Sequence, residues 1–116
     1  MNRAELFTRI RKEMLEQSGA VIFLAGNKLD GSGAVVLADG VMEEYMLAKA
    51  ESKILIPVAC SGHAAQQIWQ EIEPQLGTLF PKADVRHEFE VLCDEKSSED
   101  QLIEAIFGIL KKVRGE

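Results

Sequence analysis

The sequence predicts an α/β fold of the Rossmann-like type, a three-layer sandwich in which a short, mostly parallel sheet has helices on both faces. Two observations predict this class. Segments with apolar residues at helical spacing alternate with short apolar runs, in the order α-β-α-β-α-β-α. This alternation is typical of parallel strands joined by right-handed helical crossovers. The first run, AVIFLA at 20–25, is also continuously apolar, as expected of a strand covered on both faces.

The helices and strands of the first half are expected as follows. An amphipathic helix is predicted over 3–17 and a buried strand over 20–25. The segment 26–33 contains three glycines and predicts a loop. A helix is expected over 41–50, with Val41, Tyr45 and Ala48 on one face, Glu43 and Glu44 in its first turn and Asp39 as its cap.

The second half continues the alternation. A strand is predicted over 54–59, at an edge or with a bulge because Pro57 lacks a backbone donor, followed by a helix over 64–72. A loop is expected over 74–84 and a short third strand over 87–93, where HEFEVLC partly alternates. Ser98 and Gln101 form a capping-box pattern ahead of a final amphipathic helix.

Composition limits the classes of function. A chain of 116 residues with 47% apolar and 28% charged residues predicts a single globular domain over 1–116. The net charge of -6 disfavours general binding to nucleic-acid phosphates. No apolar run approaches the roughly 18 residues of a membrane span, and no secretory signal is evident, so we expect a cytoplasmic protein without a membrane partner. Cys60 and Cys93 are too few for a disulfide framework.

A candidate ligand site lies where the first two strands end. In open α/β sheets, ligands bind beyond the carboxyl ends of the strands. Gly26, Asn27 and Lys28 follow the first strand, and Ser61 and Gly62 follow the second and open a helix. Backbone N–H groups at a helix start hold phosphates, and Lys28 would add a charge. Glu43 is a candidate acceptor for ribose hydroxyls, so the set suits a nucleotide.

Each of these residues also has a purely structural interpretation. Gly26 and Asn27 suit a simple turn, Lys28 and Arg11 suit surface charges, Ser61 suits an N-cap, and Glu43 suits a solvated helix start. Catalytic and metal-binding groups are not expected: Cys60 and His63 lack an orienting third residue, and two histidines are too few for a familiar metal site. No resident cofactor is expected either, because no P-loop or G-x-G-x-x-G fingerprint follows a strand.

Three phrases carry a resemblance to a known family: R-x-x-M-L-x-x-S-G-A-V-I-F-L-A-G-N-K, A-D-G-V-M-E-E-Y-x-x-A and I-P-V-A-C-S-G-x-A-A-x-x-I-W. Together they resemble the STALD branch of the SLOG superfamily, best known as the carboxyl-terminal domain of the Thoeris sirtuin-type NADase. The resemblance spans about residues 9–73. It implies a Rossmann-like sensor that binds a cyclic ADP-ribose isomer and switches on an NADase effector in bacterial antiphage defence.

The resemblance also implies roles for single residues. Arg11, Lys28 and Glu43 stand at the positions that contact the ligand in that family. Ala59-Cys60-Ser61-Gly62 departs from the family's glycine-alanine-threonine-glycine turn. The family domain normally begins with a further strand and glycine-rich loops, which we expect to be missing here. The chain is then either the carboxyl-terminal half of a larger sensor or a small stand-alone relative, and in both cases an exposed sheet edge favours a homodimer or a larger assembly.

Two alternatives to a nucleotide sensor stay open. By analogy with phosphoribohydrolases of the same superfamily, the chain is a candidate nucleotide N-glycosidic hydrolase with Glu43 or Glu44 as the acid-base group, although their G-G-x-G-T phrase is absent. A structural or oligomerising domain with no ligand is the other alternative.

Overall fold

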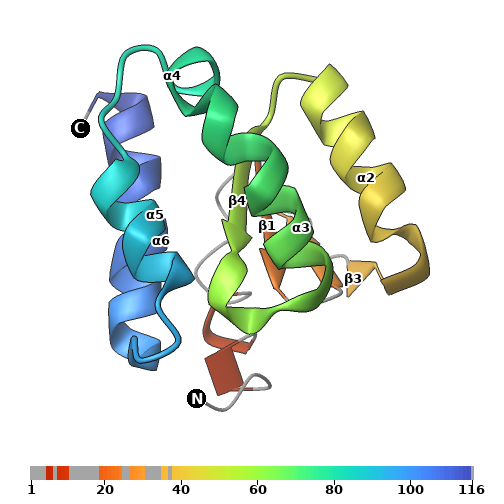
Figure 1. The fold of residues 1–116 in the computed structure, drawn as a ribbon, viewed down its shortest axis with the longest axis horizontal. Helices are drawn as coiled ribbons and strands as arrows, with labels where there is room; N and C mark the ends of the chain where they lie inside the picture. Colours follow the sequence, from red (N-terminus) through yellow and green to blue (C-terminus); the bar gives the residue numbers. More distant parts are fainter. Residues whose placement is uncertain are drawn as a thin grey trace.

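A four-stranded sheet forms the centre of the computed structural model, which describes residues 5–6, 8–10, 19–24, 27–30, 35–36 and 38–115. The strand order is β3-β2-β1-β4 (Figure 1). The strands are β1 (Ala20–Leu24), β2 (Asn27–Asp30), β3 (Val35–Val36) and β4 (Ile54–Val58). β1 runs parallel to β4, whereas β2 pairs antiparallel with both β1 and β3. The α/β, Rossmann-like class is confirmed, with two antiparallel strands added on one side of the parallel pair.

β1 lies at the centre of the hydrophobic core, as its continuous apolar run predicts. Each of its five residues is at most 2% exposed. In register, Ile22 lies beside Ile56 of β4 on one side and beside Leu29 of β2 on the other. Both edges of β1 therefore have a hydrogen-bonding neighbour.

The predicted loop over 26–33 is wrong for residues 27–30, which form β2. These residues pair with β1 from Leu24↔Asn27 to Val21↔Asp30. The glycine-rich composition around them favours a loop, but β1 is buried, and its N–H and C=O groups need partners on the side away from β4. Strand pairing therefore outweighs local preference here.

β4 is the edge strand that its proline predicts. Pro57 sits within the strand, beside Phe23 of β1, and β4 ends the strand order. An edge position leaves one side of the strand without a ladder, so proline's missing N–H is tolerated there.

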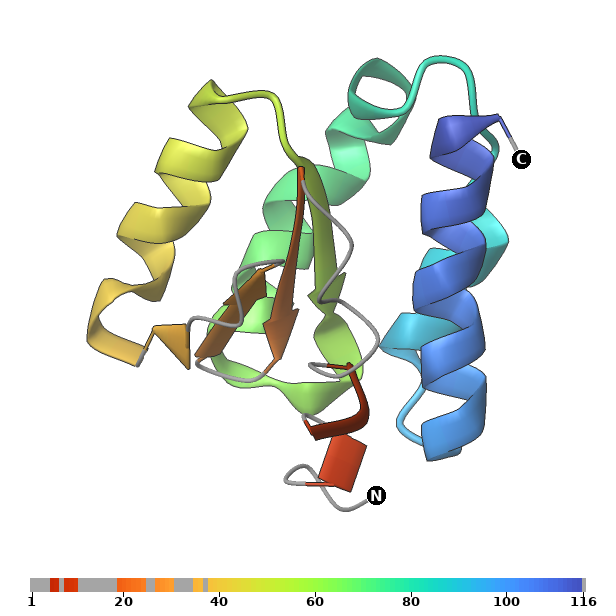
Figure 2. The same cartoon turned by 180° about the vertical axis from the view of Figure 1, so that it is seen from behind.

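Two helices cover one face of the sheet, α2 (Ala38–Ala50) and α3 (His63–Ile72). α3 lies in front of the strands in Figure 1 and behind them in the reverse view of Figure 2, and α2 contacts α3, β4 and β2. Tyr45 and Ala48 are buried as predicted, while the side chain of Val41 is not among those described. α2 begins earlier than expected, so Asp39 lies inside the helix and Glu43 in its second turn.

The buried stripe predicted for α3 is confirmed. Ala65, Ile68 and Ile72 are fully buried, and Trp69 is half-buried. Trp69 stacks on Phe89, with ring centroids 4.9 Å apart and planes 19° from parallel. This ring pair joins α3 to the carboxyl-terminal part of the chain.

The predicted third strand over 87–93 is wrong, because this segment forms helix α5 (Arg86–Cys93). Val85, Phe89 and Leu92 are spaced by four and three residues, and all three are at most 1% exposed. That spacing places them on one face of a helix, so the partial alternation of HEFEVLC is incidental. The predicted loop over 74–84 also contains short helices, η2 (Glu73–Gln75) and α4 (Leu76–Leu79).

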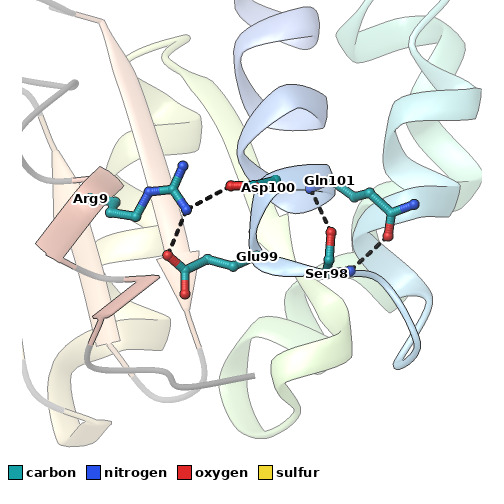
Figure 3. Close-up of polar contacts among 5 residues, drawn as sticks. All are labelled: Arg9, Ser98, Glu99, Asp100 and Gln101. Carbon is teal, nitrogen blue, oxygen red and sulfur yellow. Dashed lines mark hydrogen bonds and ion pairs between the residues drawn. The ribbon is translucent and has the colours of Figure 1, made fainter.

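The final helix, α6 (Glu99–Arg114), begins with the predicted capping box. Ser98 Oγ accepts a hydrogen bond from the Gln101 backbone at 3.1 Å, and Gln101 Oε1 accepts one from the Ser98 backbone at 2.7 Å (Figure 3). The predicted apolar stripe packs inward: Leu102, Ile103, Ile106 and Leu110 are buried, and Phe107 and Val113 are partly buried against the core.

The helical residues 5–6 and 8–10 contact the start of α6. Leu6 and Ile10 are buried, which agrees with the predicted helix; most of 3–17 lies outside the described residues. Arg9 Nη1 lies 2.7 Å from Glu99 Oε1 and 2.8 Å from Asp100 Oδ1 (Figure 3). The hydrogen bonds to Glu99 and then Asp100 raise the pKa of Arg9. No helix among the described residues is long and apolar enough to cross a membrane.

We expect Tyr45 to limit stability at alkaline pH. Its ring is fully buried against Phe23, and burial, followed by the nearby Glu71 carboxylate, raises its pKa from 10.0 to about 12. Since the folded chain holds the phenol proton more tightly than the unfolded chain, this stability is complete below pH 10.0 and is lost as the pH rises towards 12. Urea unfolding across this range measures the effect.

Tyr45→Phe is the matched variant for this prediction. The Tyr45 hydroxyl has no hydrogen bond within 3.5 Å among the described residues, so its removal leaves no partner unsatisfied. We expect the variant to be at least as stable at neutral pH and to lose less stability above pH 10.0. An unchanged alkaline profile in Tyr45→Phe would contradict this assignment.

Candidate functional site

The carboxyl ends of β1 and β4 lie side by side at the same end of the sheet. The two strands are parallel, and their last residues, Leu24 and Val58, are partners in the ladder. The first turns of α2 and α3 lie towards the same edge (Figure 1). The segments that follow both strands therefore start at one place, which is where α/β sheets bind ligands.

A tight turn joins β4 to α3. The 3-10 helix η1 (Ala59–Ser61) is followed by Gly62, whose φ of 78° and ψ of -164° lie in a region nearly restricted to glycine. The Gly62 N–H donates to the Ala59 carbonyl at 3.0 Å. The Ser61 hydroxyl donates to the Val58 carbonyl at 2.5 Å and is fully buried. Ser61 thus holds the turn against the strand, a role that the sequence interpretation did not include.

Gly62 is the N-cap residue of α3, whereas the structural interpretation of the sequence gave that place to Ser61. No side chain of the described residues caps this helix, and its first turn holds no acidic residue. The first N–H groups of a helix lack partners within the helix, and the helix dipole makes this end positive. The turn therefore presents backbone donors suited to an anion.

The other predicted residues are placed as follows. Asn27 and Lys28 are the first residues of β2, where the Asn27 backbone pairs with Leu24 and the Lys28 backbone with Phe23. Their side chains are not among those described. Because Asn27 and Val58 flank Leu24 on opposite sides, their backbones are roughly 10 Å apart, two strand spacings.

Glu43 lies on α2 with an exposed side chain, and Arg11 and Gly26 lie outside the described residues. The structure therefore brings the backbones of Asn27 and Lys28 to the same edge as Ser61 and Gly62. An anionic ligand that contacts Asn27 and Lys28 as well as Ser61 and Gly62 would span the end of β1. A ligand of the size of a dinucleotide is long enough to do so.

Cys93 does not have the features of a reactive thiol. Neither Cys60 nor Cys93 is in a disulfide. Burial, and next the negative charge of Glu73, raise the pKa of Cys93 to about 11, so its thiol is protonated at neutral pH and is a poor nucleophile. The described residues contain no group of three His, Cys, Asp or Glu side chains arranged for a metal ion.

Sequence comparisons relate the chain to one family and to longer proteins. The model of the Sir2- and TIR-associating SLOG family, STALD, matches residues 1–113. The chain is 34% identical over 104 residues to the NAD(+) hydrolase ThsA of Bacillus cereus (strain MSX-D12), covering 88% of this chain and 22% of that protein. It is 30% identical over 118 residues to the NAD(+) hydrolase ThsA of Acinetobacter baumannii (strain 532279), covering 96% and 24%. The chain spans about a quarter of the length of these relatives.

Gly62→Ala tests whether the turn depends on glycine. A Cβ at Gly62 would meet nothing within 4 Å, so the cost comes from the backbone conformation and not from a clash. We expect a loss of roughly 1–3 kcal/mol in the free energy of unfolding, measured by urea denaturation.

Gly77→Ala is the matched control for that variant. Gly77 lies in helix α4, also with nothing within 4 Å of an added Cβ, and alanine suits a helix better than glycine. It should be neutral or stabilising. Equal effects of the two variants would show that the Gly62 conformation is not required.

Proposed function

Because this chain belongs to the Sir2- and TIR-associating SLOG (STALD) family, we propose that it is a non-catalytic module that binds a nucleotide second messenger of the cyclic ADP-ribose type in bacterial antiphage defence. The observation that carries the proposal is the Gly62 turn, which opens α3 without a side-chain cap beside the end of β1. Helix starts of this kind hold phosphate groups.

The net negative charge of the chain means that an anionic ligand must be bound by donors close to it. The chain carries a net charge of -6, so its overall field repels a diphosphate. Binding then depends on short-range donors: the first N–H groups of α3 and, in this proposal, the ammonium group of Lys28 and the guanidinium of Arg11. Charge-assisted hydrogen bonds to phosphate are stronger than neutral ones, which offsets the repulsion.

Glu43 has the complementary role in the proposal. Its carboxylate is exposed on α2, the helix that starts towards the same edge of the sheet. A carboxylate accepts hydrogen bonds from a pair of ribose hydroxyls, as acidic residues do in dinucleotide-binding folds. In the proposal, the rest of the site is formed by backbone groups close to the ligand, those of Gly26, Asn27, Ser61 and Gly62.

The partner in the proposal is an NADase effector in the cytoplasm. The relatives of this chain are named NAD(+) hydrolases and extend well beyond the matched part, which covers 22% and 24% of their lengths. A ligand that binds one state of the module better than another shifts the equilibrium between them. Nucleotide binding here would in this way control NAD hydrolysis by the effector.

Calorimetric titration with cyclic ADP-ribose isomers tests the site, with NAD and linear ADP-ribose as comparison ligands. We expect saturable binding that prefers a cyclic isomer. Lys28→Ala should weaken it by roughly 1.5–3 kcal/mol, since a charge-assisted contact is lost. That cost corresponds to a roughly ten- to hundredfold higher Kd.

Lys82→Ala is the matched control, because it removes one positive charge from an exposed position outside the proposed site. It should bind like the parent chain. The proposal fails if no isomer binds, or if Lys28→Ala binds as tightly as Lys82→Ala.

Self-association is a further part of the proposal. Met46 and Leu47 are adjacent on α2 and are 59% and 52% exposed, the large apolar side chains that are mostly exposed in the described part of the chain. Covering them in a second copy removes apolar surface from water. We expect a mass of at least twice 12.8 kDa by light scattering, and a lower mass for the double variant Met46→Glu, Leu47→Lys. A monomer at micromolar concentration would contradict self-association.

A further inference from the structure

An open groove of about 750 Å³ lies between α5 and α6, apart from the proposed nucleotide site. Its lining combines apolar groups, Val91, Ala105 and Gly108, with the carboxyl group of Glu88. The volume is within the range of ligand sites in proteins, roughly 300–1,000 Å³. Neither the nucleotide proposal nor the packing of the core assigns it an occupant.

Glu88 carries an acceptor that is not satisfied. The residue is 8% exposed, and its Oε2 lies 2.7 Å from Lys112 Nζ. Lys112 Nζ also donates to the Asp84 carbonyl at 2.9 Å. The other carboxylate oxygen, Oε1, is buried and has no hydrogen-bond partner. A buried acceptor without a donor is rare in folded proteins, and a ligand N–H would satisfy it.

Gly108 keeps the space beside Glu88 free of a side chain. It lies inside α6, where glycine is among the least favourable residues. A Cβ at this position would lie 3.4 Å from Glu88 Cγ and 3.6 Å from Glu88 Oε2. The glycine therefore lets the groove reach the carboxylate at a cost to the helix, which is an observation independent of the unpaired oxygen.

The charges around the groove favour a cation. Besides Glu88, whose charge is paired with Lys112, the groove is lined by Glu90, Asp94 and Glu104, against the single ammonium group of Lys96 among the lining residues that the structure describes. Glu90, Asp94 and Glu104 are exposed and give the groove a negative rim. Such a field attracts cationic groups and repels nucleotides.

We propose that the groove binds a peptide segment in which arginine or lysine stands next to an apolar side chain. The cationic group donates to the Glu88 carboxylate, which lines the groove and has one oxygen without a hydrogen-bond partner, and the apolar side chain covers Val91 and Ala105. A peptide is favoured over a free polyamine because a polyamine has no side chain to cover these two residues. This site is separate from the proposed nucleotide site and does not depend on it.

Amide NMR titrations with the tripeptide Ac-Arg-Leu-Arg-NH2 test the proposal. We expect saturable shifts at Val91, Ala105 and Gly108, and none with Ac-Glu-Leu-Glu-NH2. Spermidine supplies charge without an apolar side chain and should bind more weakly. Stronger binding of spermidine at the same amides would overturn the assignment to a peptide.

Gly108→Ala is the decisive variant, because it fills the space beside Glu88 while favouring the helix. Its Kd for the tripeptide should rise at least ~10-fold, whereas Gly77→Ala, the same change in open space, should leave it unchanged. Glu88→Gln should weaken binding too, and Glu95→Gln, an exposed acid that does not line the groove, should not. Parent-like affinity in Gly108→Ala, or shifts spread over all acidic surfaces, would overturn the proposal.

Discussion

The fold depends on satisfying both backbone edges of β1. The strand is buried on both faces, so water cannot replace a missing hydrogen-bond partner, and an unpaired N–H or C=O there costs about as much as a lost hydrogen bond. β4 supplies parallel partners on one edge and β2 antiparallel partners on the other. The helices then cover what these three strands leave apolar: α2 and α3 contact the sheet on one face, and α5 and α6 pack beside β4.

The same pairing determines where a ligand can bind. Because β1 and β4 are parallel and end at paired residues, the segments that follow them both begin at the carboxyl-terminal end of the sheet. Because β2 pairs antiparallel with β1, Asn27 and Lys28 are placed by strand pairing and not by a free loop. Backbone in a sheet loses little further conformational freedom when a ligand binds, so a site built on it is well ordered beforehand. The Ser61 hydrogen bond and the Gly62 conformation fix the second wall in a similar way.

The sequence predicts the elements that depend on residues close to one another in the chain. The apolar run of β1, the edge position of Pro57 and the Ser98 capping box depend on neighbours close in sequence, and all three are found. The errors concern partners distant in sequence. Residues 27–30 become a strand because β1 needs them, and 87–93 becomes a helix because Phe89 must reach Trp69 and Phe80. In the site, the sequence does not predict the backbone conformation of Gly62. Serine followed by glycine before a helix is compatible with several different N-cap arrangements.

Helix α5 connects the two proposed binding regions through adjacent residues. Glu88 lines the groove, while Phe89 stacks on Trp69 of α3, the helix whose first turn forms the proposed anion seat. α5 also contacts η1, which carries Ser61. Since packed interiors transmit displacement instead of absorbing it, a partner that moves α5 would also move the rings against α3. Thermodynamic linkage then requires the reverse effect: a nucleotide that shifts α3 would change the affinity of the groove by the same factor by which the peptide changes nucleotide affinity.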